Sequence, residues 1–299
     1  MTATLNKPAG LLAGMARAAA VVAAVEAKST RHETPCGKGS MVWRRWSSER
    51  TGRAGSPVLL VHGGGGSWTH WIRNIEALAA RHTVWALDLP GLGDSAVPDA
   101  FTIDEMGVTV ERGLRALIPD GPVDVVGFSF GGAISTYVAM KLEGRLRNLV
   151  LTGSRFNIDL SREFPQLVSW KEIEDPEARL AGHRRNLEIM MIADQAHIDD
   201  LAIYVQSTNT PRARFFGPKL DPNGKLHEFL PHVRPQKRVT GISGLEDQIA
   251  KPIMHKQDSG LKAIHSNGIF HGIADAGHWV QYEGAERYNA ILLDTLAGD

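Results

Sequence analysis

The sequence predicts an α/β fold, in which a doubly wound and mostly parallel sheet carries a helical cap inserted before the penultimate core strand. From Pro57 onward, short apolar runs alternate with helical stretches. The runs are hydrophobic at nearly every position, and strands of that kind are buried on both faces, as in a parallel sheet flanked by helices. Over residues 155–236 the alternation stops, and helical stretches punctuated by prolines replace it. We interpret this interruption as the cap.

The predicted elements follow one another in a regular order. Four apolar runs before the interruption are predicted strands, at residues 58–61, 83–87, 123–128 and 146–151. The stretches between them are predicted helices, at residues 71–81, 103–117 and 133–143. Two further helices, at residues 176–193 and 197–207, lie within the interruption. The core is completed by strands at 237–242 and 269–273 and a closing helix at 285–296.

These elements divide the chain into three parts. Residues 1–30 form an N-terminal helical extension, residues 31–154 and 237–299 form the core, and residues 155–236 form the cap. In the extension, apolar residues from Leu11 to Val25 recur at steps of three and four, the spacing of one helix face. We expect this helix to pack on the body of the protein or on a partner. The alternatives are a cleaved leader and a disordered segment. Against a leader, Arg17 interrupts the apolar run, which is also too short to span a membrane.

The composition excludes several functional classes. The chain has 299 residues, and 33 Lys and Arg residues balance 33 Asp and Glu residues. Proteins that bind nucleic acid normally show a basic excess or a basic patch, so we expect no such partner. The single cysteine, Cys36, cannot form an internal disulfide, which favours the reducing cytoplasm. We expect no membrane partner and leave both a monomer and a homodimer open.

The strongest motif lies between a predicted strand and the helix that follows it. The segment Gly127-Phe128-Ser129-Phe130-Gly131 has the pattern G-x-S-x-G in the strand–turn–helix context of a nucleophile elbow. Such a turn is so sharp that the residues two positions from the serine must be small. It exposes the serine hydroxyl above the sheet and directs the amino end of a helix at it. Ser129 is therefore the predicted nucleophile.

A serine hydroxyl needs a general base, and the base needs an acid that orients it. His278 is the predicted base because it lies in a loop directly after the last predicted strand. Asp247 is the predicted acid because it follows the strand at 237–242, and folds with such an elbow have the chain order serine, acid, histidine. Glu246 and Asp159 are the alternatives for the acid.

A run of glycines after the first predicted strand supplies a candidate oxyanion hole. Backbone N–H groups in residues 62–66, with that of the residue after the nucleophile, can hold a developing negative charge. Gly64 and Phe130 are the predicted donors, and Gly65 is the second choice. No Gly-Lys-Ser/Thr follows the run, so it does not predict a phosphate loop. Without a cysteine cluster or a His-Glu-x-x-His pattern, we expect neither a metal nor a cofactor.

Aromatic and methionine side chains near these motifs are candidates for the substrate pocket. Phe128 and Trp279 flank the nucleophile and the base, and Met190 and Met191 lie on a predicted cap helix. Methionine suits adaptable apolar surfaces. We predict that these four residues line an apolar pocket, with core packing as the alternative role of each.

Together the motifs resemble those of the α/β-hydrolase superfamily over most of residues 31–299. Besides the elbow, the resemblance rests on the glycine run with Ser67-Trp68, on Asp-Leu-Pro-Gly-Leu-Gly-Asp-Ser at residues 88–95, on residues 244–247, and on Gly-His-Trp at residues 277–279. Within the superfamily, the chain resembles capped esterases and carbon–carbon bond hydrolases of aromatic degradation. The resemblance implies the same sheet, cap and catalytic triad.

The sequence departs from the carbon–carbon hydrolases at two points. Those enzymes usually carry an asparagine before the nucleophile and an arginine in the cap that binds the dienol acid. Here Phe128 precedes Ser129, and residues 202–206 of the predicted cap contain no arginine. Arg212 and Arg214 lie nearby in the sequence. The departure favours an ester substrate.

The sequence thus predicts a cofactor-independent serine hydrolase. It would cleave a carboxylic ester, or a related acyl bond, of a small apolar or aromatic substrate through an acyl-enzyme. One alternative is a carbon–carbon bond hydrolase of meta-cleavage-type dienol acids. An alternative of another class is a non-hydrolytic small-ligand receptor on the same fold. In each case the expected partner is a small molecule.

Overall fold

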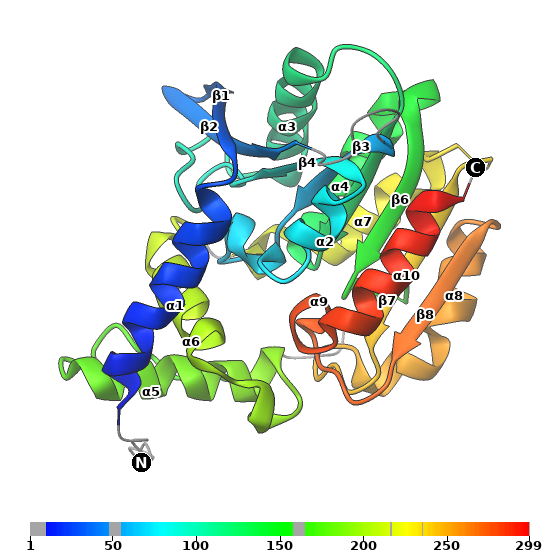
Figure 1. Ribbon diagram of the computed structural model, residues 1–299. Coiled ribbons are helices and arrows are strands. Elements are labelled where there is room, and N and C mark those ends of the chain that lie inside the picture. Colours follow the sequence, from blue (N-terminus) through cyan, green and yellow to red (C-terminus); the bar gives the residue numbers. More distant parts are fainter. Residues whose placement is uncertain (1–9, 48–54, 158–164, 216, 235, 299) are drawn as a thin grey trace.

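An eight-stranded sheet forms the centre of the protein (Figure 1). The computed structural model describes residues 10–47, 55–157, 165–215, 217–234 and 236–298. The strands lie in the order β1-β2-β4-β3-β5-β6-β7-β8, and the pairs from β4 to β8 are all parallel. This confirms the predicted mostly parallel sheet. The strands are β1 Thr30–Cys36, β2 Gly39–Trp46, β3 Gly55–Val61, β4 His82–Leu87, β5 Val123–Phe128, β6 Leu146–Thr152, β7 Arg238–Gly244 and β8 Gly268–Ile273.

The apolar runs do not predict β1 and β2, which form an antiparallel edge on this sheet. β1 pairs with β2, and β2 pairs with β4. In β1 only Thr34 and Cys36 are buried, while the other side chains are exposed or half-buried. An edge strand that buries so few side chains has no apolar run, and hydrophobicity alone therefore misses it.

Alternate residues of the core strands enter two hydrophobic clusters, one on each face of the sheet. In β3, Val58 and Leu60 belong to one cluster, and Leu59 and Val61 belong to the other. The first face is covered by α2 (Ile75–Ala79), α9 (Val280–Glu283) and α10 (Ala285–Ala297), and the second by α3 (Ile103–Leu117), α4 (Phe130–Leu142) and α8 (Gln257–Ile264). Helices on both faces make the sheet doubly wound, as predicted.

The segment 155–236 contains three helices in two settings. α5 (Pro176–Asn186), which continues into a π-helical turn over Leu187–Met191, and α6 (Asp200–Asn209) lie away from the sheet (Figure 1). α7 (Pro222–Phe229) instead packs on α4, where the rings of Phe229 and Tyr137 are 5.3 Å apart. Part of the segment expected as cap therefore belongs to the flank of the sheet.

Short 3-10 helices fill several connections. They lie at Trp68–Trp71, Glu143–Arg145, Gln195–His197, Thr210–Arg212, Gly217–Leu220, Leu230–His232 and Lys251–Lys256. The first of these and the five-residue α2 replace the single helix predicted at 71–81. Asn74, at the start of α2, is buried and donates to the backbone oxygen of Gln281 in α9 over 2.9 Å. This contact with another element helps to set the path of the connection.

An N-terminal helix, α1 (Leu11–Glu26), packs along α6 and reaches the edge of the sheet (Figure 1). Leu11, Gly14, Ala18 and Val25 are its buried residues, which lie on the predicted face. At its carboxyl end, the oxygen of Val25 accepts a hydrogen bond from the Trp46 indole over 2.8 Å. Within the described residues, none of the helices is long and apolar enough to cross a bilayer.

Candidate active site

Ser129 lies in a strained turn between β5 and α4. Its φ of 51° and ψ of −116° are unfavourable for a residue with a side chain. A Cβ on Gly127 or Gly131 would lie less than 3.0 Å from neighbouring atoms, which for Gly131 are the backbone oxygens of Val61 and His62. The two glycines thus let the turn close against the end of β3, as the elbow motif predicts.

The structure brings Ser129, His278 and Asp247 into one line of hydrogen bonds. The Oγ of Ser129 lies 2.9 Å from Nε2 of His278, and Nδ1 of His278 lies 2.8 Å from Oδ2 of Asp247. Because an ionised carboxylate only accepts, Nδ1 carries the proton and donates to Asp247. Nε2 is then free to accept the hydroxyl proton of Ser129. This is the tautomer that a general base requires.

Asp247 is held by its own turn as well as by His278. Its side chain is fully buried, and its Oδ1 accepts the N–H of Ile249 over 2.8 Å. Glu246, the first alternative acid, points elsewhere, since its half-exposed carboxylate pairs with Lys251 over 2.6 Å. Asp159, the second alternative, lies outside the described residues. The geometry therefore favours Asp247 as the partner of His278.

Two buried histidines, to whose side chains the sequence motifs assign no role, hold the glycine run. The N–H of Leu89 donates to Nε2 of His62 over 2.9 Å, so Nδ1 of His62 donates to the oxygen of Gly63 over 2.7 Å. The N–H of Gly63 donates to Nδ1 of His70 over 3.3 Å. Both ends of Gly63 are thus fixed by imidazoles. In the sequence, the only signal for these roles is that His62 directly precedes the glycines. The roles of His62 and His70 depend on the burial of both rings in the folded structure.

This arrangement sets the direction of the Gly64 amide. Described peptide bonds are trans, and in a trans peptide the C=O and N–H groups point in opposite directions. Since the oxygen of Gly63 points at His62, the N–H of Gly64 points away from His62. A Cβ on Gly64 would lie 3.6 Å from the Cβ of Phe130, so the two predicted oxyanion donors are neighbours. Gly65 has a φ of 64°, which favours glycine there.

Burial favours the neutral form of both histidines. Burial lowers the pKa of His62, against the opposing charge of Asp88. Burial, with the charges of His62 and His278, lowers the pKa of His70 well below its usual value. A neutral imidazole can accept a hydrogen bond, whereas a protonated one cannot. The low pKa values therefore preserve the contacts that orient Gly63.

The predicted pocket residues are buried to different extents. The Phe128 ring is buried 5.1 Å from the ring of His278, and Trp279 is fully buried with its indole donating to the oxygen of His70 over 2.9 Å. Met191 is nearly buried, and Met190 is half-buried. Phe128 and Trp279 thus pack in the core next to His278. Of the four residues, Met190 has the most accessible side chain.

The two arginines near the predicted cap bind a loop that precedes α3. Arg212 forms an ion pair with Asp94, and Arg214 donates to the oxygen of Ser95 over 2.7 Å. Both contacts lie in the segment at residues 88–95. In the described part of the chain, no group of three His, Cys, Asp or Glu residues is placed to hold a metal ion.

Similar proteins are known over most of the length of this chain. A model of the α/β-hydrolase fold matches residues 56–285. The chain is 36% identical to a 2-hydroxy-6-oxo-2,4-heptadienoate hydrolase of Pseudomonas putida, over 82% of this chain and 91% of that protein. It is 30% identical to the dihydrolipoyllysine-residue acetyltransferase component of an acetoin cleaving system of Cupriavidus necator, over 83% of this chain. The chain spans 66% of the length of that relative.

Solved structures show the same fold at lower identity. A meta-cleavage product hydrolase superimposes with a TM-score of 0.67 at 21% identity, covering 88% of this chain and 97% of that one. A thermophilic esterase from Thermogutta terrifontis superimposes with a TM-score of 0.65 at 22% identity, covering 89% of this chain and 98% of that one. An esterase and a meta-cleavage product hydrolase thus share the fold of this chain.

Proposed function

Because this chain belongs to the α/β-hydrolase fold family, we propose that it is a cofactor-independent serine hydrolase that cleaves a carboxylic ester of a small apolar or aromatic substrate. The line of hydrogen bonds from Ser129 through His278 to Asp247 carries this proposal. It joins the hydroxyl at the strained turn to an imidazole in the tautomer that a general base needs and to a buried carboxylate, which supports the proposal.

The proposed reaction has two halves. The Oγ of Ser129 attacks the ester carbonyl and gives its proton to Nε2 of His278, while Asp247 stabilises the resulting imidazolium. The N–H groups of Gly64 and Phe130, with Gly65 as the second choice, stabilise the oxyanion, and each such donor contributes roughly 3 kcal/mol. The C–O bond to the alcohol breaks, and His278 returns the proton to the leaving oxygen. Water, deprotonated by His278, then releases the acid and regenerates Ser129.

The side chains around the triad support an uncharged substrate. Phe128, Trp279 and Met191 are apolar and buried, and Met190 is half-buried. A substrate carboxylate would need a cation in the pocket, because burying an unpaired charge is costly. Arg212 and Arg214 are already engaged by Asp94 and by the oxygen of Ser95.

A carbon–carbon bond hydrolase of dienol acids is the second candidate. The similarity to a 2-hydroxy-6-oxo-2,4-heptadienoate hydrolase favours it, and the same triad would serve it. The departures at Phe128 and in residues 202–206 count against it. Turnover of a coloured dienol acid at rates far above those on simple aryl esters would select this second candidate.

We propose that residues 155–236 supply the cap through α5 and α6, that the partner is a small molecule, and that the protein works in the cytoplasm. The unpaired, buried Cys36 supports a reducing compartment. Sedimentation of the full chain would decide between a monomer and a homodimer.

Labelling with a fluorophosphonate tests the nucleophile without knowledge of the substrate. We expect a single adduct on Ser129, found by intact mass and peptide mapping. Ser129→Ala should abolish the adduct and lower kcat for any accepted ester by at least 10³-fold, and His278→Ala should do the same, because neither variant can form the activated hydroxyl. Full hydrolysis by Ser129→Ala would refute the mechanism. Ligand-dependent thermal stabilisation without labelling or turnover would instead indicate a receptor.

A further inference from the structure

Glu283, five residues after His278, carries a buried carboxylate between two separate segments. Its side chain has no exposed surface. Its Oε2 accepts the N–H of Gly277 over 2.6 Å, directly before the histidine. On its other side the carboxylate accepts the N–H groups of Ala193 and Asp194, over 3.0 and 2.7 Å. One carboxylate thus binds two segments. We call residues 274–280, which include His278, the histidine loop, and residues 191–199 the cap base.

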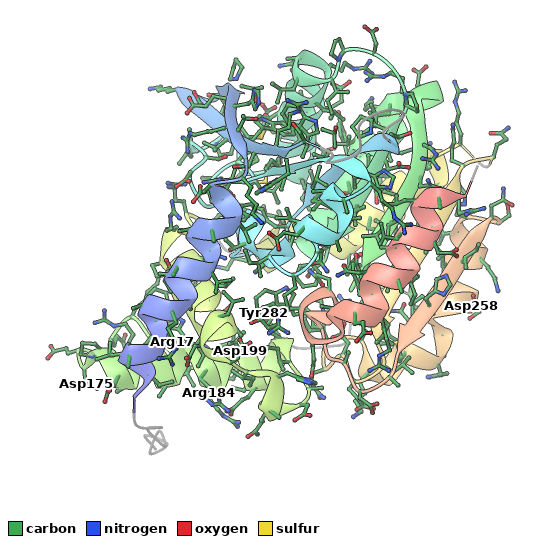
Figure 2. All side chains as sticks on the ribbon, viewed as in Figure 1. Arg17, Asp175, Arg184, Asp199, Asp258 and Tyr282 are labelled. Atoms are coloured by element: carbon green, nitrogen blue, oxygen red, sulfur yellow. The ribbon has the colours of Figure 1, made fainter. Side chains whose placement is uncertain are left out.

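Two further contacts join the same pair of segments. The N–H of Trp279 donates to the oxygen of Met191 over 2.7 Å. The hydroxyl of Tyr282 donates to Oδ1 of Asp199 over 2.5 Å, where α6 begins, and Figure 2 shows these two residues beside each other. A Cβ on Gly277 would lie 2.8 Å from the nitrogen of Ala193, so the two backbones are in direct contact. The five residues that follow His278 therefore hold the cap base along its length.

The buried carboxylate of Glu283 needs hydrogen-bond donors from both segments. An ionised carboxylate only accepts hydrogen bonds, and three N–H groups from two segments satisfy it here. If the cap base moved away from the histidine loop, part of a buried charge would lose its donors, which is strongly unfavourable. The position of the cap base and the position of Gly277 are thus linked through one side chain.

We propose that Glu283 is a positioning residue that couples the cap base to His278. The carboxylate fixes the Gly277 amide, and Gly277 in turn sets the imidazole between Ser129 and Asp247. When residues 191–199 are in place, the His278 imidazole is aligned with Ser129 and Asp247. When residues 191–199 are displaced, the imidazole is misaligned. The coupling rests on the proposed function, because its effect on the reaction passes through His278.

The experiment compares Glu283→Gln, Glu283→Asp and Glu286→Gln in the full-length chain. Glutamine keeps the shape of Glu283 but replaces one acceptor with an NH₂ donor facing an N–H group, while aspartate keeps the charge on a shorter stem. Glu286 is exposed on the neighbouring α10, which makes it a matched control. The measurements are the fluorophosphonate labelling rate of Ser129, kcat and KM for a small acetate ester, hydrogen exchange of residues 191–199 and 274–280, and the unfolding temperature.

We expect Glu283→Gln to lower the labelling rate and kcat in parallel by at least tenfold, to change KM less than threefold, and to accelerate exchange in both segments together. Glu283→Asp should recover part of the labelling rate, and Glu286→Gln should stay within twofold of the unmodified chain. If Glu283→Gln unfolds, the aspartate variant decides by the same readouts.

Two results would overturn the coupling. Labelling and kcat within twofold of the unmodified chain, with only the unfolding temperature lowered, would make Glu283 purely structural. Faster exchange in only one of the two segments would show that they move independently. Failure of the unmodified chain to react at Ser129 would contradict the proposed function instead, and the exchange measurement would still decide the coupling.

Discussion

At the scale of single residues, the candidate site depends on hydrogen bonds that have one workable assignment. Asp247 can only accept, so Nδ1 of His278 donates and Nε2 faces the Ser129 hydroxyl. Leu89 can only donate through its N–H, so His62 directs its other nitrogen at Gly63. Fixed donors and acceptors of this kind need no rearrangement when charge develops on the substrate.

Replacing Asp247 with asparagine should remove the preference for the productive tautomer. The amide can donate to Nδ1 of His278, which would move the imidazole proton to Nε2, where it opposes the serine proton. We expect Asp247→Asn to lower kcat for an accepted ester by roughly 10³–10⁴-fold with little loss of folding. Glu246→Gln is the matched control and should stay within twofold. A large loss in the control and none in Asp247→Asn would reassign the acid.

A methyl group at Gly131 should disrupt the elbow. A Cβ there would meet the backbone oxygens of Val61 and His62, neither of which can swing aside as a side chain would. We expect Gly131→Ala to lower the free energy of unfolding by about 1–3 kcal/mol and to reduce Ser129 labelling strongly. Gly144 has no atoms near its Cβ position, so Gly144→Ala should change neither quantity. Chemical denaturation and labelling rates provide the comparison, and equal behaviour of the two variants would contradict the steric argument.

At the scale of elements, α1 joins α6 to the edge of the sheet. Gly14 allows a close approach, since a Cβ there would clash with the carboxylate of Asp200. Glu26, at the other end of α1, pairs with the buried Arg44 over 2.7 Å, and Arg44 also binds Asp88 and Asp94. Asp88 accepts from the N–H of Trp68, after the glycine run. α1 therefore contacts α6 directly, and it is linked through Arg44 and Asp88 to the residue Trp68 after the glycine run.

A large side chain at Gly14 should separate α1 from α6. Gly14→Leu places four carbons where the Asp200 carboxylate lies, and we expect the free energy of unfolding to fall by about 1–3 kcal/mol despite the better helix propensity of leucine. Ala16 is exposed on the same helix, so Ala16→Leu should be neutral or slightly stabilising. Urea unfolding of both variants tests this. A Gly14→Leu protein as stable as the unmodified chain would show that α1 does not pack closely in solution.

At the scale of the whole molecule, the parallel sheet brings distant parts of the chain to one edge. The glycine run follows β3, Ser129 follows β5, Asp247 follows β7 and His278 follows β8. The carboxyl ends of parallel strands meet at the same edge, which is where open α/β sheets place their ligands. The two histidines that hold the glycine run at this edge are buried.

Stability should therefore decline below neutral pH. Burial lowers the pKa values of His62 and His70, so between the unfolded value of about 6.5 and their lower folded values the unfolded chain binds more protons. Each group then costs about 1.4 kcal/mol of stability per pH unit. Asp124 opposes this because burial raises its pKa to about 6. We expect urea unfolding to give a lower free energy at pH 5.5 than at pH 7.5, and an equal or higher value would contradict the neutral histidines.

The sequence by itself determined the parts of this protein that local chemistry specifies. Core strands buried on both faces must be apolar throughout, and a turn as tight as the elbow must have glycine on both sides of Ser129, so both features are visible as patterns. The order of the motifs then indicated the fold. The predicted roles of Ser129, His278 and Asp247 remain to be tested, although the structure places the three side chains in contact.

Tertiary structure alone decided what depends on direction and burial. It turned Asp247 inward and Glu246 outward, engaged Arg212 with Asp94, and placed α7 against α4. It also buried Glu283 between the histidine loop and the cap base. A sequence pattern fixes which face of one element is apolar, but a polar side chain takes its role from donors and acceptors that lie far away along the chain. Those partners meet only when the elements pack.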